Sequence, residues 1–275
     1  MASTSGSTVE LSEDEEREVD KRSPPRAAVV FETIRREGET ELRRPVFSLA
    51  LSGLAAGLSM GASLAGEGLI RSMLPDAQWR PLAVSFGYTL GFLIVVIGRQ
   101  QLFTENTITA ILPLLDDKDK GSKLLQVLRL WSVVLLANIA GAAAFAFAAA
   151  HTSIFSAEVR TTFGEIAREA VAPGFGSILL RGIASGWLIA LMVWMLPGAD
   201  TNRPLIVLIV TYFVGLGSFS HIIAGSVEAI YLVAIGGLSW AGYLGGFLLP
   251  VFIGNVIGGT SLVALLNYGQ VVAEN

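Results

Sequence analysis

An apolar run over residues 205–236 constrains the fold of this chain more than any other stretch, because polar groups interrupt it near its middle. Its 32 residues would form a helix about 48 Å long, whereas the hydrocarbon core of a bilayer is roughly 30 Å thick. Two glycines, two serines and His221 fall within residues 215–221, which favours a break there. Non-helical backbone at this depth is tolerated only beside a protein-lined cavity or a water-filled path. The run therefore predicts a broken membrane helix with His221 as a pore residue.

The composition is that of an integral membrane protein, with 52% apolar and 15% charged residues. The net charge of -4 says little, because acidic residues cluster in residues 10–16, outside the apolar part. With no cysteine, disulfides and thiolate catalysis are excluded. Only two histidines occur, which argues against a multi-histidine metal site. We therefore expect no metal and no cofactor.

Before the apolar part, residues 1–44 are expected to form an N-terminal tail that ends in a short surface segment. Residues 1–27 are too polar to bury a core of their own. Residues 28–44 alternate apolar residues with arginines, which suits a helix lying on the membrane surface or, equally well, a solvated linker.

A second polar interruption occurs in residues 81–115, an apolar stretch that contains a polar cluster at residues 99–106. Such a cluster would cost several kcal/mol facing lipid, so it is expected to face the protein interior or a cavity. Two matched helix breaks are thus predicted, around residues 102–106 and around residues 217–221.

Four further apolar runs complete a membrane domain over residues 45–268 with six predicted crossings; they cover residues 45–66, 130–150, 182–196 and 240–266. An amphipathic connection covers residues 151–176, and residues 269–275 are expected to be a short tail. Lysine and arginine concentrate before the first crossing and between the second and third. This distribution predicts that both termini are cytoplasmic, in a multi-pass protein of the cell (inner) membrane.

Two short matches suggest an internal repeat. Residues 53–57 resemble residues 182–186, with a glycine at both ends of each segment, and residues 138–141 resemble residues 255–258 at an offset of 117 positions. The same offset superposes Thr104 on His221. Units of three crossings must have opposite orientations, so the fold class we expect is an all-α membrane protein with an inverted three-plus-three repeat and broken second and fifth helices.

The residues at the two breaks resemble those of the formate/nitrite transporter family. The likeness rests on Leu102, Phe103 and Thr104 in the second helix, His221 in the fifth, and Asn255 within Gly-Asn-Val-Ile-Gly-Gly in the sixth. It implies an aquaporin-like fold, a homopentamer with one pore in each protomer, and passage of small monocarboxylates or nitrite together with a proton. Thr104 would face His221 at a constriction formed by Leu102 and Phe103.

The chain departs from the family pattern at three places. The Gly-x-acid run that often precedes Leu-Phe-Thr is replaced by Gly98-Arg99-Gln100-Gln101. Ser220 stands where formate channels usually carry an acid, and Gly186 where they carry an asparagine before the fourth-helix tryptophan. These differences affect the solute that the pore would accept rather than the fold. Acetate, lactate, hydrosulfide or a neutral molecule are therefore alternatives to formate and nitrite. Two alternatives belong to other functional classes: an intramembrane enzyme that uses His221, and a structural pentamer with a closed pore.

Arg99 is the unusual residue of the polar cluster, since its guanidinium stays ionised in a predominantly apolar stretch. It is expected to pair with a carboxylate, for which Glu105 and Glu228 are the candidates. Alternatively, it attracts anions from a water-filled vestibule of the pore. Pairing with a carboxylate is the favoured interpretation.

Overall fold

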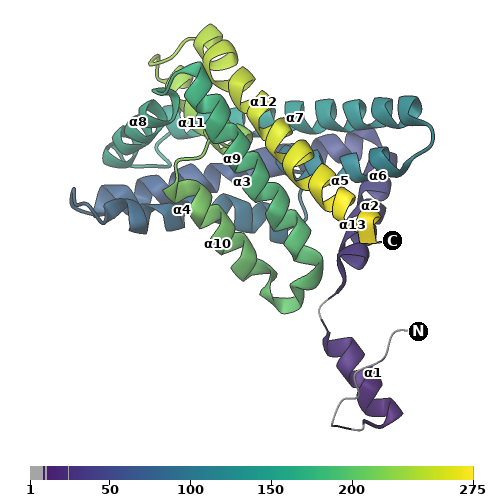
Figure 1. Cartoon of the computed structure of the whole chain (residues 1–275). Coiled ribbons are helices and arrows are strands. Elements are labelled where there is room, and N and C mark those ends of the chain that lie inside the picture. Colours follow the sequence, from purple (N-terminus) through teal and green to yellow (C-terminus); the bar gives the residue numbers. More distant parts are fainter. Residues whose placement is uncertain (1–8, 10, 24, 275) are drawn as a thin grey trace.

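The computed structural model describes residues 9, 11–23 and 25–274, and every element in these ranges is a helix (Figure 1). Five helices are long and apolar enough to cross a membrane; they cover Val46–Met73, Arg80–Ile97, Lys120–His151, Phe175–Gly198 and Gly242–Ala273. The remaining apolar run, residues 205–236, is divided between two shorter helices. The chain thus has the helices of a multi-pass membrane protein.

The polar N-terminal segment contains one helix, α1 (Glu13–Arg22), which stands apart from the bundle in Figure 1. It begins with a capping box, because the Ser12 backbone N–H donates to Glu15 Oε2 at 2.8 Å and the Glu15 N–H to Ser12 Oγ at 3.4 Å. Those of its side chains that the structure describes are exposed, so this part of the expected tail is solvated yet helical. Residues 1–8, 10 and 24 of the expected tail lie outside the described residues.

Helix α2 (Ala27–Arg43) covers one end of the bundle and has one apolar face. Val30, Phe31, Ile34 and Leu42 are buried, and the ring of Phe31 lies 5.6 Å from that of Tyr268. The segment is therefore a packed helix rather than a linker, and its position on a membrane surface stays a prediction. On its polar face, hydrogen bonds from Arg35 and Arg36 lower the pKa of Glu32 to about 2.

The second crossing is broken earlier than expected. Helix α4 (Arg80–Ile97) is followed by non-helical residues 98–102, then by α5 (Phe103–Thr109) and α6 (Ile111–Asp116). Residues 103–106, which we expected within the break, form the first turn of α5. The chain turns at Arg99, whose φ of 51° lies in the left-handed region.

The fifth crossing is broken where the sequence predicts it, over residues 217–221. Helix α10 (Arg203–Leu216) ends before this segment, and α11 (Ile222–Ala234) follows it. Ser218 has a φ of 50°, which matches the turn at Arg99. The two breaks therefore correspond at an offset of 119 positions, with Leu102 equivalent to His221. The expected equivalence of Thr104 and His221 is wrong by two residues.

Two buried asparagines hold the breaks in the same manner. Asn138 Oδ1 accepts from the Phe103 N–H at 2.9 Å, and its Nδ2 donates to the carbonyls of Gly53 and Gln101 at 2.7 and 2.8 Å. Asn255 likewise accepts from the Ile222 N–H at 2.9 Å. Its Nδ2 donates to the carbonyls of Gly182 and Ser220 at 2.8 and 3.0 Å. The repeated Gly and Asn motifs thus mark the same set of hydrogen bonds in both halves.

Glycines let the helices that carry these asparagines pack closely. A Cβ on Gly57 of α3 (Val46–Met73) would lie 2.0 Å from the Asn138 carbonyl oxygen in α7 (Lys120–His151). A Cβ on Gly186 of α9 (Phe175–Met195) would lie 2.4 Å from the Asn255 carbonyl oxygen in α12 (Leu249–Val256). Both helix pairs therefore approach closely at small residues, as helices in membranes commonly do.

The last crossing is one long helical segment that includes two stretches of π-helix, Gly242–Leu248 and Ile257–Leu265, flanking α12. It continues as α13 (Leu266–Glu274), through most of the residues that we expected to form a tail. The amphipathic connection forms α8 (Ala157–Val171), which closes the end of the bundle opposite α2.

Candidate functional site

The two helix breaks bring Thr104 and His221 together in the middle of the bundle. Thr104 Oγ1 lies 2.8 Å from His221 Nε2, and the two side chains are 0% and 1% exposed. Thr104 is in the first turn of α5, and His221 is the N-cap residue of α11. The short helices α5 and α11 therefore begin close together, where the Thr104 hydroxyl contacts the His221 imidazole.

The hydrogen bonds of His221 define which ring nitrogen carries the proton. Nδ1 accepts from the backbone N–H groups of Ile223 at 3.3 Å and Ala224 at 3.2 Å, which caps α11. An acceptor at Nδ1 places the proton of neutral imidazole on Nε2, which then donates to Thr104 Oγ1. Thr104 is left with its own hydroxyl proton to donate. A proton on Nδ1 would face two N–H donors, so an imidazolium forms here only if the cap is lost.

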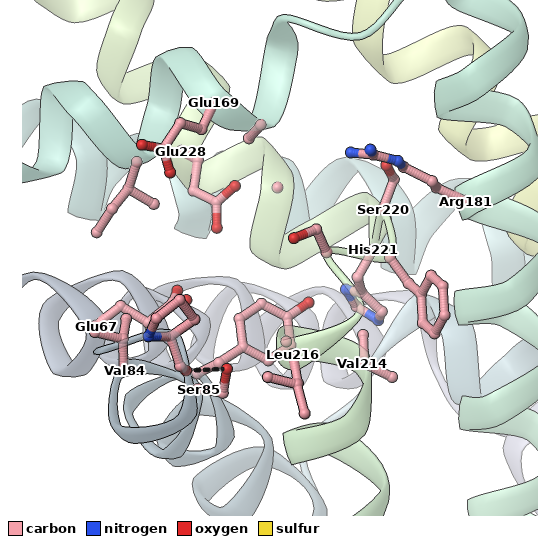
Figure 2. Close-up of a pocket in the computed structure, with 18 of the residues that line it drawn as sticks. Glu67, Val84, Ser85, Glu169, Arg181, Val214, Leu216, Ser220, His221 and Glu228 are labelled. Carbon is pink, nitrogen blue, oxygen red and sulfur yellow. Dashed lines mark hydrogen bonds between the residues drawn. The ribbon is translucent and has the colours of Figure 1, made fainter. Parts of the chain in front are cut away.

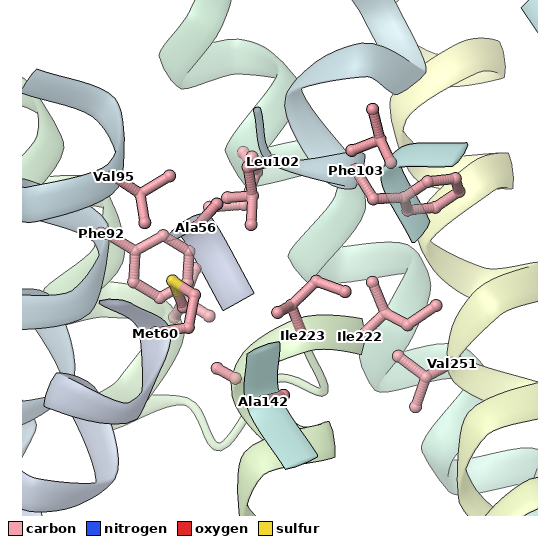
Figure 3. Packing of buried hydrophobic residues seen from close by; sticks show 14 of the residues in the cluster. Ala56, Met60, Phe92, Val95, Leu102, Phe103, Ala142, Ile222, Ile223 and Val251 are labelled. Atoms are coloured by element: carbon pink, nitrogen blue, oxygen red, sulfur yellow. The ribbon is translucent and has the colours of Figure 1, made fainter. Parts of the chain in front are cut away.

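Apolar side chains pack around this pair of residues. The ring of Phe92 lies edge-on to the imidazole, with centroids 4.8 Å apart, and Leu102 is fully buried in the same core (Figure 3). Phe103 instead stacks on Phe252 at 5.6 Å and contacts the Trp131 ring at 5.8 Å. Among the described residues, then, the aromatic ring against the histidine is that of Phe92, which the sequence reasoning missed.

A cavity of about 350 Å³ reaches His221 from the α8 end of the bundle (Figure 2). Its walls come from α3, α4, α8, α9, α10 and α11 and from the break at residues 217–221. Ser220 and His221 line it directly. The cavity has the size of a site for a small solute.

The cavity contains charges of both signs. Arg71 donates to Glu169 at 2.7 and 2.8 Å, and Arg80 pairs with Asp76 at 3.0 Å. Arg181, on the first turns of α9, lines the cavity without a hydrogen bond or ion pair to any described residue. The sequence reasoning missed Arg181, although a lone arginine directly before the predicted crossing at residues 182–196 was a usable signal.

Arg99 does not line this cavity. Its Nη2 lies 2.6 Å from Glu37 Oε1 of α2, and the two side chains are 68% and 43% exposed. Arg99 thus has the expected carboxylate partner, but this partner is Glu37 of α2 instead of Glu105 or Glu228.

Gly186 leaves no room for the asparagine of the family pattern, because even a Cβ would overlap the Asn255 backbone. Ser220 keeps its carbonyl bonded to Asn255. Ser220 and Gly186 therefore both lie among the residues that position His221.

Two helix breaks, a buried histidine and threonine between them, and a cavity that reaches the pair define a membrane protein of the channel or transporter class. A family model described as "Formate/nitrite transporter" matches residues 28–269. The chain therefore belongs to the formate/nitrite transporter family, as the resemblance predicted, and this is a family of transporters rather than enzymes.

Several relatives and solved structures resemble the chain. "Inner membrane protein YfdC" of Escherichia coli (strain K12) is 42% identical over 266 residues, which cover 97% of this chain and 83% of the relative. "Formate channel BtFdhC" of Bacillus thuringiensis is 28% identical, covering 69% of this chain and 74% of the relative. A solved "Pentameric formate channel with formate bound" has a TM-score of 0.71 at 20% identity, covering 82% of this chain and 98% of that chain. This likeness shows that the chain has the all-helical fold of that channel structure.

Proposed function

We propose that the protein conducts small monovalent anions such as formate or nitrite across a membrane, together with a proton, through a pore in each protomer of a homopentamer. The observation that carries the proposal is the 2.8 Å contact between Thr104 and His221 beside the cavity. The names of the formate channels that resemble the chain support the substrate class and the pentamer.

The architecture that we propose is an inverted three-plus-three repeat of six crossings in the inner membrane, with both termini cytoplasmic. The matched asparagine bonds at the two breaks support the repeat. The arginines that precede the first crossing support the orientation, since positive residues favour the cytoplasmic side.

The chemistry follows from the cost of taking a charge into an apolar passage. A bare anion loses many kcal/mol of solvation there, whereas the neutral acid crosses far more easily. Arg181, which pairs with none of the described residues, would attract the anion from the cavity. The Nε2–H of His221 and the hydroxyl of Thr104 would then donate hydrogen bonds to it while it takes up a proton from the cavity. His221 stays neutral, because its Nδ1 caps α11. Leu102 and Phe92 would exclude water, and Phe103 and Asn255 would hold the two breaks in place.

The proposal is tested by flux into proteoliposomes with a panel of small solutes. We expect uptake of formate or nitrite with proton uptake that a trapped pH indicator records. Selective uptake of acetate, lactate, hydrosulfide or a neutral solute would change the substrate within the same class. No flux of any solute by assembled protein would contradict the proposal.

The first variant to test is His221→Asn, because asparagine is itself a good N-cap residue and can preserve the bonds to Ile223 and Ala224. We expect assembly to persist and flux to fall on the order of a hundredfold, because the Nε2–H that donates to the anion is lost. The form of the pH dependence should stay that of the wild type, since His221 remains neutral. Flux at several pH values measures this. A wild-type rate in an assembled variant contradicts this role, and a flattened pH profile would show that His221 titrates during transport.

The second test compares Arg181→Gln with Arg99→Gln. Loss of the positive charge at Arg181 is expected to raise the half-saturating anion concentration about fivefold, because a nearby unit charge is worth about 1 kcal/mol in water. Arg99→Gln removes an exposed ion pair and should change stability by less than about 1 kcal/mol and leave flux unchanged. A selective change of anion flux in Arg99→Gln would instead favour the vestibule role for Arg99.

A further inference from the structure

Glu228 is a buried acid in the cavity that the proposed transport chemistry does not use. Its side chain lines the cavity, the residue is 7% exposed, and its carboxyl has no hydrogen bond or ion pair with any described residue. An unpaired carboxylate in a membrane interior costs several kcal/mol and marks a functional site by default. The group is therefore stable only when it holds a proton or meets a solute.

Glu228 lies on the same face of α11 as His221. Seven residues are close to two helical turns, which places the two side chains about 10 Å apart along the helix axis. Gly225, between them, also lines the cavity and has no side chain to separate them. A solute that enters from the α8 end thus passes Glu228 before it reaches His221.

A second acid, Glu67 of α3, lines the cavity, and Figure 2 shows both carboxyls directed into the same space. Its Oε2 is buried without a hydrogen-bond partner. Two carboxylates in one enclosed site repel each other, and a proton on either of them relieves the repulsion. Tyr88 of α4 also faces this space, and a phenol is neutral near pH 7.

The cations around the cavity leave the two acids without a salt bridge. Arg71 is bonded to Glu169, and Arg80 to Asp76. Arg181 makes no ion pair with either acid. The acids are thus available to exchange protons with the solution in the cavity.

We propose that Glu228, assisted by Glu67, is the group that supplies the transported proton to a weak-acid anion in the cavity. This inference rests on the proposed function and names the proton source for it, since Nδ1 of His221 is occupied by the α11 cap. The O–H bond of the Glu228 carboxyl breaks, and an O–H bond forms on a carboxylate or nitrite oxygen of the solute. Glu228 is left as a carboxylate, and water in the cavity reprotonates it from the solution at the α8 end.

The test is uptake of formate by the Glu228→Gln variant in proteoliposomes. The orientation of the protein in them is determined by protease access to the N-terminal segment. With the α8 side at neutral pH, we expect coupled formate and proton uptake to fall on the order of a hundredfold, the lower end of what a positioned proton donor contributes. As the α8-side pH falls and formic acid enters already protonated, the deficit should shrink. Glu165→Gln is the control, because Glu165 lies at the same end but does not line the cavity.

Outcomes separate this proposal from the proposed function. Wild-type flux together with a Glu228→Gln variant of unchanged rate and pH profile overturns the proton source alone. Wild-type protein that transports no anion overturns both. A uniform loss of flux at every α8-side pH in assembled Glu228→Gln protein also overturns the proton source, because it indicates a structural role.

If Glu228→Gln fails to assemble, Glu228→Asp replaces it. Retaining the carboxyl on a shorter side chain should preserve coupled flux and displace the midpoint of its dependence on α8-side pH. A loss of proton coupling in assembled Glu228→Asp, which still carries the carboxyl, would overturn the proposal.

Discussion

Replacing Asn255 by leucine is expected to destabilise the folded protein strongly. The change leaves the Ile222 N–H and the Ser220 carbonyl without their partner at the centre of the bundle, and it removes a second hydrogen bond from the Gly182 carbonyl of α9. Each unsatisfied buried polar group costs about 1–3 kcal/mol, so the loss is about 3 kcal/mol or more. Such a loss is a large part of the stability of an ordinary domain. Size-exclusion chromatography and thermal unfolding in detergent measure it.

The equivalent change, Asn138→Leu, should have the same effect, because Asn138 makes the corresponding three hydrogen bonds at the other break. Thr211→Val is the matched control. Thr211 is fully buried in α10, but its hydroxyl donates only to the Val207 carbonyl of the same helix. An Asn255→Leu protein as stable as Thr211→Val would contradict the assigned role of the asparagines.

A single methyl group at Gly57 is the second change for which we expect a large effect. The added Cβ would lie 2.0 Å from the carbonyl oxygen and 2.8 Å from the Cα of Asn138, and real Cβ atoms do not approach other atoms so closely. Since the obstacle is backbone, α3 and α7 must separate. Overpacking of this kind costs about 1–3 kcal/mol. Here the separation also strains the 2.7 Å bond from Asn138 to Gly53, so the first break loses part of its support.

Gly57→Ala should therefore lower both the unfolding temperature and flux through assembled protein. Gly176→Ala is the control, since Gly176 lies in α9 and its Cβ would meet nothing within 4 Å. Alanine there should be neutral or slightly stabilising, because it reduces the entropy of the unfolded chain. Equal unfolding temperatures for the two variants would show that the α3–α7 contact tolerates a side chain.

The sequence by itself determined the membrane class, the family and the break beside His221. Apolar run lengths and polar interruptions are local properties, and a 32-residue run cannot cross roughly 30 Å of hydrocarbon as one straight helix. Likewise, glycines spaced four apart indicate close helix contacts wherever the partner lies. The family motif then linked Thr104 to His221, and their 2.8 Å contact agrees with it.

Only the tertiary structure decided the register of the two breaks and the partners of the charged groups. The 117-residue offset came from Asn138 and Asn255, but each break is held through the residue whose N–H reaches its asparagine, which sets the offset there to 119. Arg99 pairs with Glu37, which is distant in sequence and is brought near by the packing of α2. The cap on His221 Nδ1, and the lack of a described partner for the Glu228 carboxyl, likewise depend on which groups the fold brings within hydrogen-bond distance. A local sequence pattern does not specify which distant groups come that close.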